Sequence, residues 1–315
     1  MTRSLSLLAA VLVVAACAEP PKSSEGVPAV QFTEANWVAP READIPNDSA
    51  GAAIRRGLYL LRNTPESLPN FASSGLRCTS CHQDDGIKLS AGSLTGSHAR
   101  FPAYMSRTGA VISLADRVNY CFTRSLAGNV LPVGSREMTD LLAYLAFIST
   151  DVPMGTHLET SGMPKMPEVL EGDAGRGERL YTEKTCAVCH GADGNGVGIL
   201  PPLWGPRSYS IGASMSRIER AAAFIYFNMP QTAPGSLTPQ EAFDLAAYVN
   251  GKPRPDSPAK ELDWPVGGNP SDVPYDLRSG HRAFRPPPLI PRTRPERSVV
   301  PVPQRAAGTP RAGAR

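Results

Sequence analysis

The sequence Cys78-Thr79-Ser80-Cys81-His82 has a counterpart 108 residues further along the chain, Cys186-Ala187-Val188-Cys189-His190. Each copy is followed by a loop rich in small residues and then by two helical patterns. The second of these patterns contains Asp-x-x-x-Tyr, at Asp140 to Tyr144 in the first copy and at Asp244 to Tyr248 in the second. One order of motifs that occurs twice predicts two copies of one folded module.

Two cysteines separated by two residues and followed at once by histidine are typical of covalent c-type haem attachment. A single copy is also compatible with a redox dithiol or half of a zinc site, but two copies favour haem. The residues involved are Cys78, Cys81 and His82 in the first copy and Cys186, Cys189 and His190 in the second. The sequence therefore predicts two covalently bound haem c groups, with the histidines as iron ligands, in an all-α fold of two tandem cytochrome c domains with long irregular loops.

A second sulfur ligand is expected in each domain, because Cys121 lies 39 residues after His82 and Met229 lies 39 residues after His190. Met229 stands between a helical pattern and a proline, and its neutral thioether would raise the reduction potential of its haem. Core packing is the alternative role for a methionine. Three other methionines compete as the second ligand: Met163, Met166 and Met215.

Cys121 lies in the helical pattern Leu114 to Ser125, which Ser113 is expected to cap. Arg117 four residues before it, Arg124 three after it and Ser125 four after it would share one helix face with it. Nearby cations favour the thiolate, which is the form that binds metal. An inert buried thiol is the alternative, and Met105 and Met138 compete as ligand. A thiolate ligand would give the first haem the lower potential, so electrons would move to the second haem, and the arginines predict an anionic substrate at the first.

The N-terminus and overall composition point to an exported protein. A positive Arg3 followed by the apolar run Leu5 to Ala16 predicts a signal peptide, and Cys17 fits either a cleavage site or the lipidated cysteine of a lipobox. We therefore expect a periplasmic location, with a possible lipid anchor at Cys17. The formal net charge of +3 is too small to suggest a nucleic-acid partner.

The expected organisation follows from the motifs, from composition and from the Pro-rich connections. It consists of a signal peptide (1–18), an N-terminal arm (19–51), cytochrome c domain 1 (52–150), a linker (151–172), cytochrome c domain 2 (173–251), a C-terminal wrapping segment (252–281) and an Arg- and Pro-rich disordered tail (282–315).

Several stretches spread from Ala52 to Tyr275 form a combination that is more specific than the attachment motifs alone. They are CTSCH (78–82), SLADRVNYCFTRSL (113–126) with LP (131–132), EMTDLLAYLAFIS (137–149), CAVCHGADGNG (186–196), LPPLWGPRSYSIGASM (200–215), NMP (228–230), DWPVGG (263–268) and DVPYD (272–276). Together they resemble the thiosulfate dehydrogenase family of dihaem c-type cytochromes.

The resemblance implies interconversion of thiosulfate and tetrathionate, with cysteine and histidine as ligands of the active-site haem. By position, Cys121 matches the family's cysteine ligand, and Arg117 and Ser125 match its active-site pair. Asn228-Met229 matches the distal ligand pair of the second haem. Some members of the family have Lys where this chain has Asn228, and that Lys is thought to exchange with Met as ligand.

The expected function is therefore oxidation of two thiosulfate ions to tetrathionate, or the reverse reduction, with Cys121, Arg117, Arg124 and Ser125 as catalytic residues and a small cytochrome c as external electron partner. Two alternatives remain open at this point. The chain could be a periplasmic electron carrier in which Cys121 is structural, or a cysteine-ligated haem subunit of a sulfur-oxidising multienzyme complex.

Overall fold

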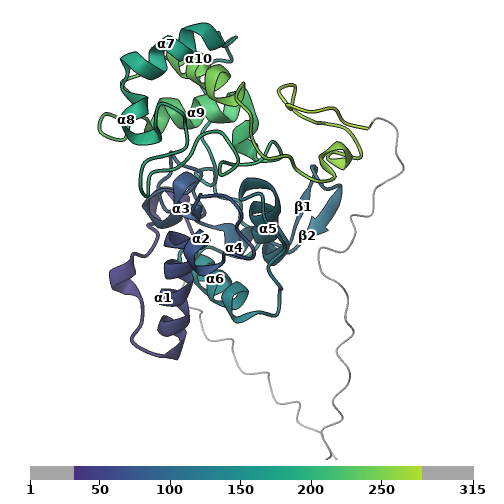
Figure 1. Cartoon of the computed structure of the whole chain (residues 1–315). Coiled ribbons are helices and arrows are strands. Elements are labelled where there is room, and N and C mark those ends of the chain that lie inside the picture. Colours follow the sequence, from purple (N-terminus) through teal and green to yellow (C-terminus); the bar gives the residue numbers. More distant parts are fainter. Residues whose placement is uncertain (1–31, 279–315) are drawn as a thin grey trace, which may run out of the picture.

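The chain folds into two helical units that lie one above the other, with a C-terminal segment running back beside the first (Figure 1). The computed structural model describes residues 32–278. The expected signal peptide with Cys17, most of the arm's first half and the Arg-rich tail lie outside the described residues. Within 32–278 no helix is long and apolar enough to cross a bilayer.

Domain 1 contains mostly short helices. Its elements are η1 (Glu34–Asn36), η2 (Glu42–Asp44), α1 (Ser49–Arg62), α2 (Thr64–Ser67), α3 (Cys78–Cys81), η3 (Asp84–Gly86), α4 (Ser97–Arg100), β1 (Ala103–Met105), β2 (Ala110–Ile112), α5 (Leu114–Tyr120), the π turn η4 (Cys121–Ser125) and α6 (Arg136–Phe147). The antiparallel hairpin β1–β2 occupies part of the expected loop and pairs Ala103 with Ile112.

Domain 2 repeats this plan with fewer elements. They are α7 (Ala174–Glu183), α8 (Cys186–His190), η5 (Ser214–Ser216), α9 (Ile218–Asn228) and α10 (Pro239–Asn250), and η6 (Lys260–Leu262) follows in the C-terminal segment. η5 and α9 are separated by Arg217, whose backbone is extended. A capping box fixes where α10 begins. The Thr238 side chain accepts a hydrogen bond from the backbone N–H of Glu241, and the Glu241 side chain accepts one from the backbone N–H of Thr238.

The same helix crossing builds both domains, α1 against α6 in domain 1 and α7 against α10 in domain 2. A Cβ on Gly57 would lie 2.0 Å from the backbone oxygen of Asp140, and a Cβ on Gly177 would lie 2.0 Å from that of Asp244. Only glycine allows backbones to approach this closely. The residue before each glycine is an arginine that pairs with the buried aspartate: Arg56 with Asp140 and Arg176 with Asp244. This contact explains the aspartate of the repeated Asp-x-x-x-Tyr pattern.

Segments outside the helix pairs join the two domains. Tyr209 and Ala213, from the long loop of domain 2, are buried in the main apolar core of domain 1 beside Phe122 and Met138. The arm packs on domain 1, where the Trp37 indole N–H donates to the carbonyl oxygen of Thr150 at 2.8 Å. The C-terminal segment meets the β1–β2 hairpin at one end (Figure 1), where the Trp264 amide donates to the carbonyl of Arg107, in the turn between the strands, at 2.9 Å.

Candidate active site

The first attachment motif forms one helical turn, α3, that leads directly into His82. The Nδ1 atom of the His82 ring contacts the carbonyl oxygen of Gly92. A carbonyl only accepts, so Nδ1 donates and the lone pair of Nε2 stays free to bind a metal. Gly92 has a φ of 62°, and a Cβ there would lie 3.2 Å from Nδ1. Glycine therefore permits the contact that orients the histidine.

Cys121 begins the π turn that interrupts the expected helix. α5, capped by Ser113 as expected, ends at Tyr120, and the Leu126 amide donates to the Cys121 carbonyl at 2.9 Å across the wider turn. One helix face does not run unbroken from Arg117 to Ser125, because the π turn rotates the residues that follow Cys121. Turns of this type occur frequently at functional sites.

The Cys121 thiol lies in a strongly polarised environment. The Arg117 Nη1 atom donates to Sγ at 3.1 Å. Burial acts to raise the pKa of Cys121, but the Arg117 guanidinium and a hydrogen bond with the His82 side chain outweigh it, and the pKa falls to about 6. Cys121 therefore favours the thiolate, the form that was expected to bind iron.

The other two cysteines of this domain behave in the opposite way. Burial raises the pKa of Cys78 to about 11 and that of Cys81 to about 12, and the neighbouring Cys121 contributes to both shifts. Cys121 is therefore close enough to both thiols and to the His82 ring for these groups to influence one another's pKa values. Two neutral thiols, an imidazole with a free Nε2 and a thiolate are the donor set that a covalently attached haem with two axial ligands requires.

A cavity of about 90 Å³ opens beside Cys121. It is several times larger than the minimum that one water molecule needs. Its lining residues are Met105, Arg107, Thr108, Arg117, Tyr120, Arg124, Ser125, Gly212 and Ser214. The structure thus brings together all three polar residues expected beside Cys121, namely Arg117, Arg124 and Ser125. We call this space the arginine pocket.

Two residues of this region were missed by the sequence reasoning. Arg107 lies in the turn between β1 and β2, in a stretch expected to be a plain loop. Asp263, from the C-terminal segment, accepts hydrogen bonds from Arg107 Nε at 2.8 Å and from Arg124 Nη2 at 2.5 Å. Asp263 belongs to the stretch DWPVGG that was matched to the family, so the match was the signal that could have identified it.

The competing sulfur ligands in domain 1 differ in position. Met138 is fully buried in the apolar core, whereas Met105 lines the arginine pocket. Among the candidates for the second haem, Met166 and Met215 pack against buried clusters, while Met229 is half-buried at the end of α9.

The second attachment motif repeats the geometry of the first. The His190 Nδ1 atom donates to the carbonyl oxygen of Pro201 at 2.9 Å, which again leaves Nε2 free. Burial lowers the pKa of His190, so the neutral, metal-binding form is favoured. Cys186 is half-buried and Cys189 is exposed at the surface of α8.

Asn228, directly before Met229, ties domain 2 to domain 1. Its Nδ2 donates to the Ser90 carbonyl at 2.7 Å, and the Ser90 hydroxyl donates to its Oδ1 at 2.9 Å. The Asn228 side chain is fully buried. A lysine side chain at this position has no acceptor atom and could not repeat both contacts.

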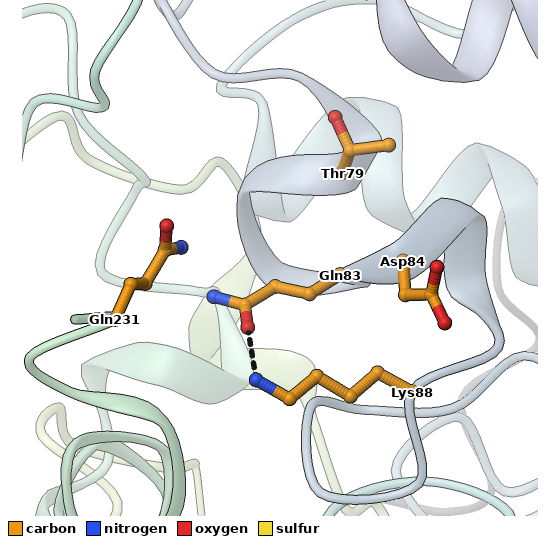
Figure 2. A pocket seen from close by; sticks show the side chains of 5 residues that line it. All are labelled: Thr79, Gln83, Asp84, Lys88 and Gln231. Carbon is orange, nitrogen blue, oxygen red and sulfur yellow. Dashed lines mark hydrogen bonds between the residues drawn. The ribbon is translucent and has the colours of Figure 1, made fainter. Parts of the chain in front are cut away.

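A wider, open hollow of about 380 Å³ lies between the first attachment motif and the loop after Met229 (Figure 2). Thr79, Gln83, Asp84 and Lys88 line it from domain 1, and Gln231 lines it from domain 2. The Lys88 ammonium donates to the Gln83 side-chain oxygen at 2.9 Å.

Comparisons with known proteins identify the two domains. The profile of the SoxA/TsdA cytochrome c domain matches residues 70–154, and that of cytochrome c matches residues 174–252. Thiosulfate dehydrogenase from Psychrobacter arcticus is 40% identical over 240 residues, which cover 74% of this chain and 73% of that protein. Thiosulfate dehydrogenase from Allochromatium vinosum is 39% identical over 258 residues, which cover 79% of this chain and 91% of that protein.

Among solved structures, the thiosulfate dehydrogenase TsdBA from Marichromatium purpuratum, in its as-isolated form, superposes with a TM-score of 0.65 at 34% identity. The match covers 71% of this chain and about half, 51%, of that chain. Two cytochrome c domains and relatives of this identity over most of the sequence lead to one assignment: the chain belongs to the thiosulfate dehydrogenase family of dihaem c-type cytochromes.

Proposed function

We propose that this chain is an exported dihaem cytochrome that interconverts thiosulfate and tetrathionate at a haem ligated by His82 and Cys121. One observation supports the proposal most strongly. Cys121, whose lowered pKa favours the thiolate, lies beside a pocket that is lined by three arginines and Ser125. Electron transfer alone does not require such a pocket. The names of the similar proteins support the choice of thiosulfate as substrate.

The residues of each domain fit a covalently bound haem c. Cys78 and Cys81 would hold the first haem, and Cys186 and Cys189 the second, for which His190 and Met229 would be the axial ligands. The two haems would supply one-electron acceptors for the two electrons that coupling of two thiosulfate ions to one tetrathionate releases. Support for Met229 comes from its position at the end of α9, next to the tethered Asn228.

The pocket residues counter the charge of the substrates. Two thiosulfate dianions about 6 Å apart, in an effective dielectric of about 20, repel each other by roughly 11 kcal/mol. Arg117 and Arg124 carry fixed positive charge and forked donors that suit sulfonate oxygens, and the Ser125 hydroxyl can add a hydrogen bond. These side chains therefore allow two like-charged reactants to be held close together.

Arg117 has a second task in this scheme. Its Nη1 contact with Cys121 Sγ stabilises negative charge on sulfur, so the same guanidinium favours the thiolate and faces the anion pocket. In this proposal Cys121 either remains a ligand or forms a transient S-thiosulfonate with the first thiosulfate, a two-electron oxidation whose electrons the two haems would accept. The terminal sulfur of the second thiosulfate would then attack the sulfur that the first one contributed, which forms tetrathionate and releases the Cys121 thiolate. The N-terminal export pattern supports a periplasmic location, with Cys17 as possible lipid anchor, and a small cytochrome c would be the external electron partner.

The test is anaerobic addition of thiosulfate to the purified oxidised holoprotein. We expect reduction of the haems, seen in their absorption bands, together with formation of tetrathionate. Cys121→Ala should abolish both and change the spectrum of one haem, while the mass keeps two haems. As a matched control, Met105→Ala removes the neighbouring sulfur and should keep the spectrum of the cysteine-ligated haem.

The outcomes separate the competing functions. A wild-type protein that thiosulfate does not reduce would be an electron carrier. A protein that reacts only when a carrier subunit presents the thiosulfate would be a haem subunit of a multienzyme complex. Cys121→Ala protein that makes tetrathionate at the wild-type rate would exclude a catalytic role for this cysteine.

A further inference from the structure

The arginine pocket is completed by a residue that lies far away in sequence. Asp263 follows η6 in the C-terminal segment, and only 3% of its side chain is exposed. Each of its carboxylate oxygens contacts a different arginine, Oδ2 with Arg107 and Oδ1 with Arg124, and Oδ2 also accepts from the Tyr275 hydroxyl at 2.7 Å. One buried carboxylate thus fixes two of the three arginines that line the pocket.

The charges around the pocket do not cancel. Arg107 and Arg124 are close enough that Arg107, together with burial, lowers the pKa of Arg124. Among the described residues, Asp263 is the carboxylate paired with Arg107 and Arg124, and the Cys121 thiolate contacts Arg117, so three guanidinium charges face two negative charges and an excess of one remains. This net positive charge attracts an anion, whereas one more carboxylate would remove it.

The N–H donors of Arg107 and Arg124 are only partly used by contacts within the protein. Arg107 donates from Nε to the Asp263 carboxylate. From Nη2 it donates to the Gly212 carbonyl at 2.7 Å and to the Tyr275 hydroxyl at 2.6 Å. Within residues 32–278 its Nη1 atom donates to no protein group. Arg124 is held through Nη2 on one side and lies 4.2 Å above the Tyr120 ring. Both guanidinium groups are therefore fixed while N–H donors remain for a ligand.

The backbone beside Asp263 is strained. Trp264 has a φ of 51°, a region that residues with a side chain rarely adopt. Its amide donates to the Arg107 carbonyl, and the Arg107 guanidinium lies 4.8 Å from the centre of its ring. These contacts hold Asp263 and Trp264 against Arg107. A strained backbone conformation such as that of Trp264 persists where the surrounding contacts stabilise it.

We propose that Asp263 is a positioning residue for the anion site: it holds Arg107 and Arg124 in the orientation in which their remaining N–H groups face the pocket. The role rests on the proposed function, because the anion it serves is the thiosulfate or tetrathionate of that reaction. The C-terminal segment is thereby part of the active site, although it lies outside both cytochrome c domains.

The experiment measures binding without turnover. Fully oxidised holoprotein has no electrons to give to tetrathionate, so calorimetric titration with tetrathionate reports the dissociation constant, and intact mass after the titration checks that Cys121 has formed no S-thiosulfonate with it. We compare Asp263→Asn, which removes the charge and one acceptor, with Asp263→Glu, which keeps the charge but moves the carboxylate by one methylene. Asp272→Asn is the matched control, because Asp272 lies in the same segment and pairs with Arg217 at 2.6 Å, away from the pocket.

Asp263→Asn loses the charge-assisted contacts that hold Arg107 and Arg124, and we expect this loss of orientation to outweigh the gain in net positive charge and to weaken tetrathionate binding about tenfold. Asp263→Glu should weaken binding to a similar degree, because the buried site has no room for the displaced carboxylate. Asp272→Asn should bind within about twofold of wild type. Haem spectra should stay unchanged in all three variants, which separates this role from one at Cys121.

Wild-type affinity in Asp263→Asn, or in Asp263→Glu, would overturn the proposal, and so would an equal loss in Asp272→Asn. If the Asp263 variants do not assemble with haem, Tyr275→Phe removes only one oxygen from the cluster and is expected to weaken binding about threefold; an unchanged dissociation constant would then reject the positioning role. Failure of the oxidised wild-type protein to bind tetrathionate would instead count against the proposed function itself.

Discussion

Replacing Arg117 with alanine removes one of the three guanidinium groups of the pocket and the Nη1 contact with Cys121 Sγ at 3.1 Å. A hydrogen bond to a charged group contributes about 1.5–3 kcal/mol. If Arg117 makes one such contact with the reacting anion, kcat/KM for thiosulfate should fall by about tenfold to a hundredfold. Arg117 also lowers the pKa of Cys121, so if Cys121 is the ligand as proposed, its bond to iron should loosen more readily at low pH in this variant.

The assay is initial-rate kinetics at low thiosulfate with an artificial electron acceptor, together with absorption spectra near neutral pH. Arg117→Lys keeps the charge without the planar fork and should give an intermediate rate. Arg136→Ala is the charge-matched control, because its side chain is 70% exposed on α6 of the same domain. It should leave kcat/KM within about twofold of wild type.

Two results would refute this reasoning. Wild-type kcat/KM in Arg117→Ala would mean that the guanidinium does not contact the reacting anion. An equal loss in Arg136→Ala would mean that overall charge, rather than this pocket, attracts the substrate.

Three other perturbations test the haem sites and the fold. Gly92→Ala places a Cβ 3.2 Å from His82 Nδ1 at a φ of 62°, so it should alter the spectrum of the first haem and leave the second unchanged; identical spectra of both haems would argue against this orientation of the histidine. Met229→Ala should lower one haem potential in a redox titration and remove the Met–Fe(III) charge-transfer band, and an unchanged spectrum would reopen the choice of ligand. Gly177→Ala forces a Cβ to 2.0 Å from the Asp244 carbonyl and should cost about 1–3 kcal/mol or more, seen as a lower melting temperature of the holoprotein; an unaltered melting temperature would show that the helix crossing is not tight.

The parts of the fold that depend on short-range spacing could be predicted from the sequence. The attachment motifs, the helices around Asp140 and Asp244 and the Ser113 cap all follow from residues a few positions apart. Domain 1 was expected to begin at residue 52, but its first long helix, α1, begins three residues earlier, at Ser49, because Asp48 caps it. Such boundaries depend on single side-chain contacts, which periodicity does not register.

The parts that the sequence did not predict depend on long-range contacts. Asp263 contacts Arg107 and Arg124 across 156 and 139 residues, and Ser90 contacts Asn228 across 138. No local pattern distinguishes such an aspartate or serine from a solvent-exposed one. The π turn was missed for a different reason, because the spacing of Arg117, Cys121 and Ser125 fits an ordinary helix equally well.

The two hydrogen bonds between Ser90 and Asn228 have a consequence for the speed of electron flow. Ser90 lies two residues before Gly92, which orients His82, and Asn228 directly precedes Met229. The loops that serve the two centres are therefore fastened to each other, and no hinge motion is needed to bring them together. Internal electron exchange should then be insensitive to solvent viscosity, whereas the diffusional encounter with an external acceptor should slow as glycerol is added.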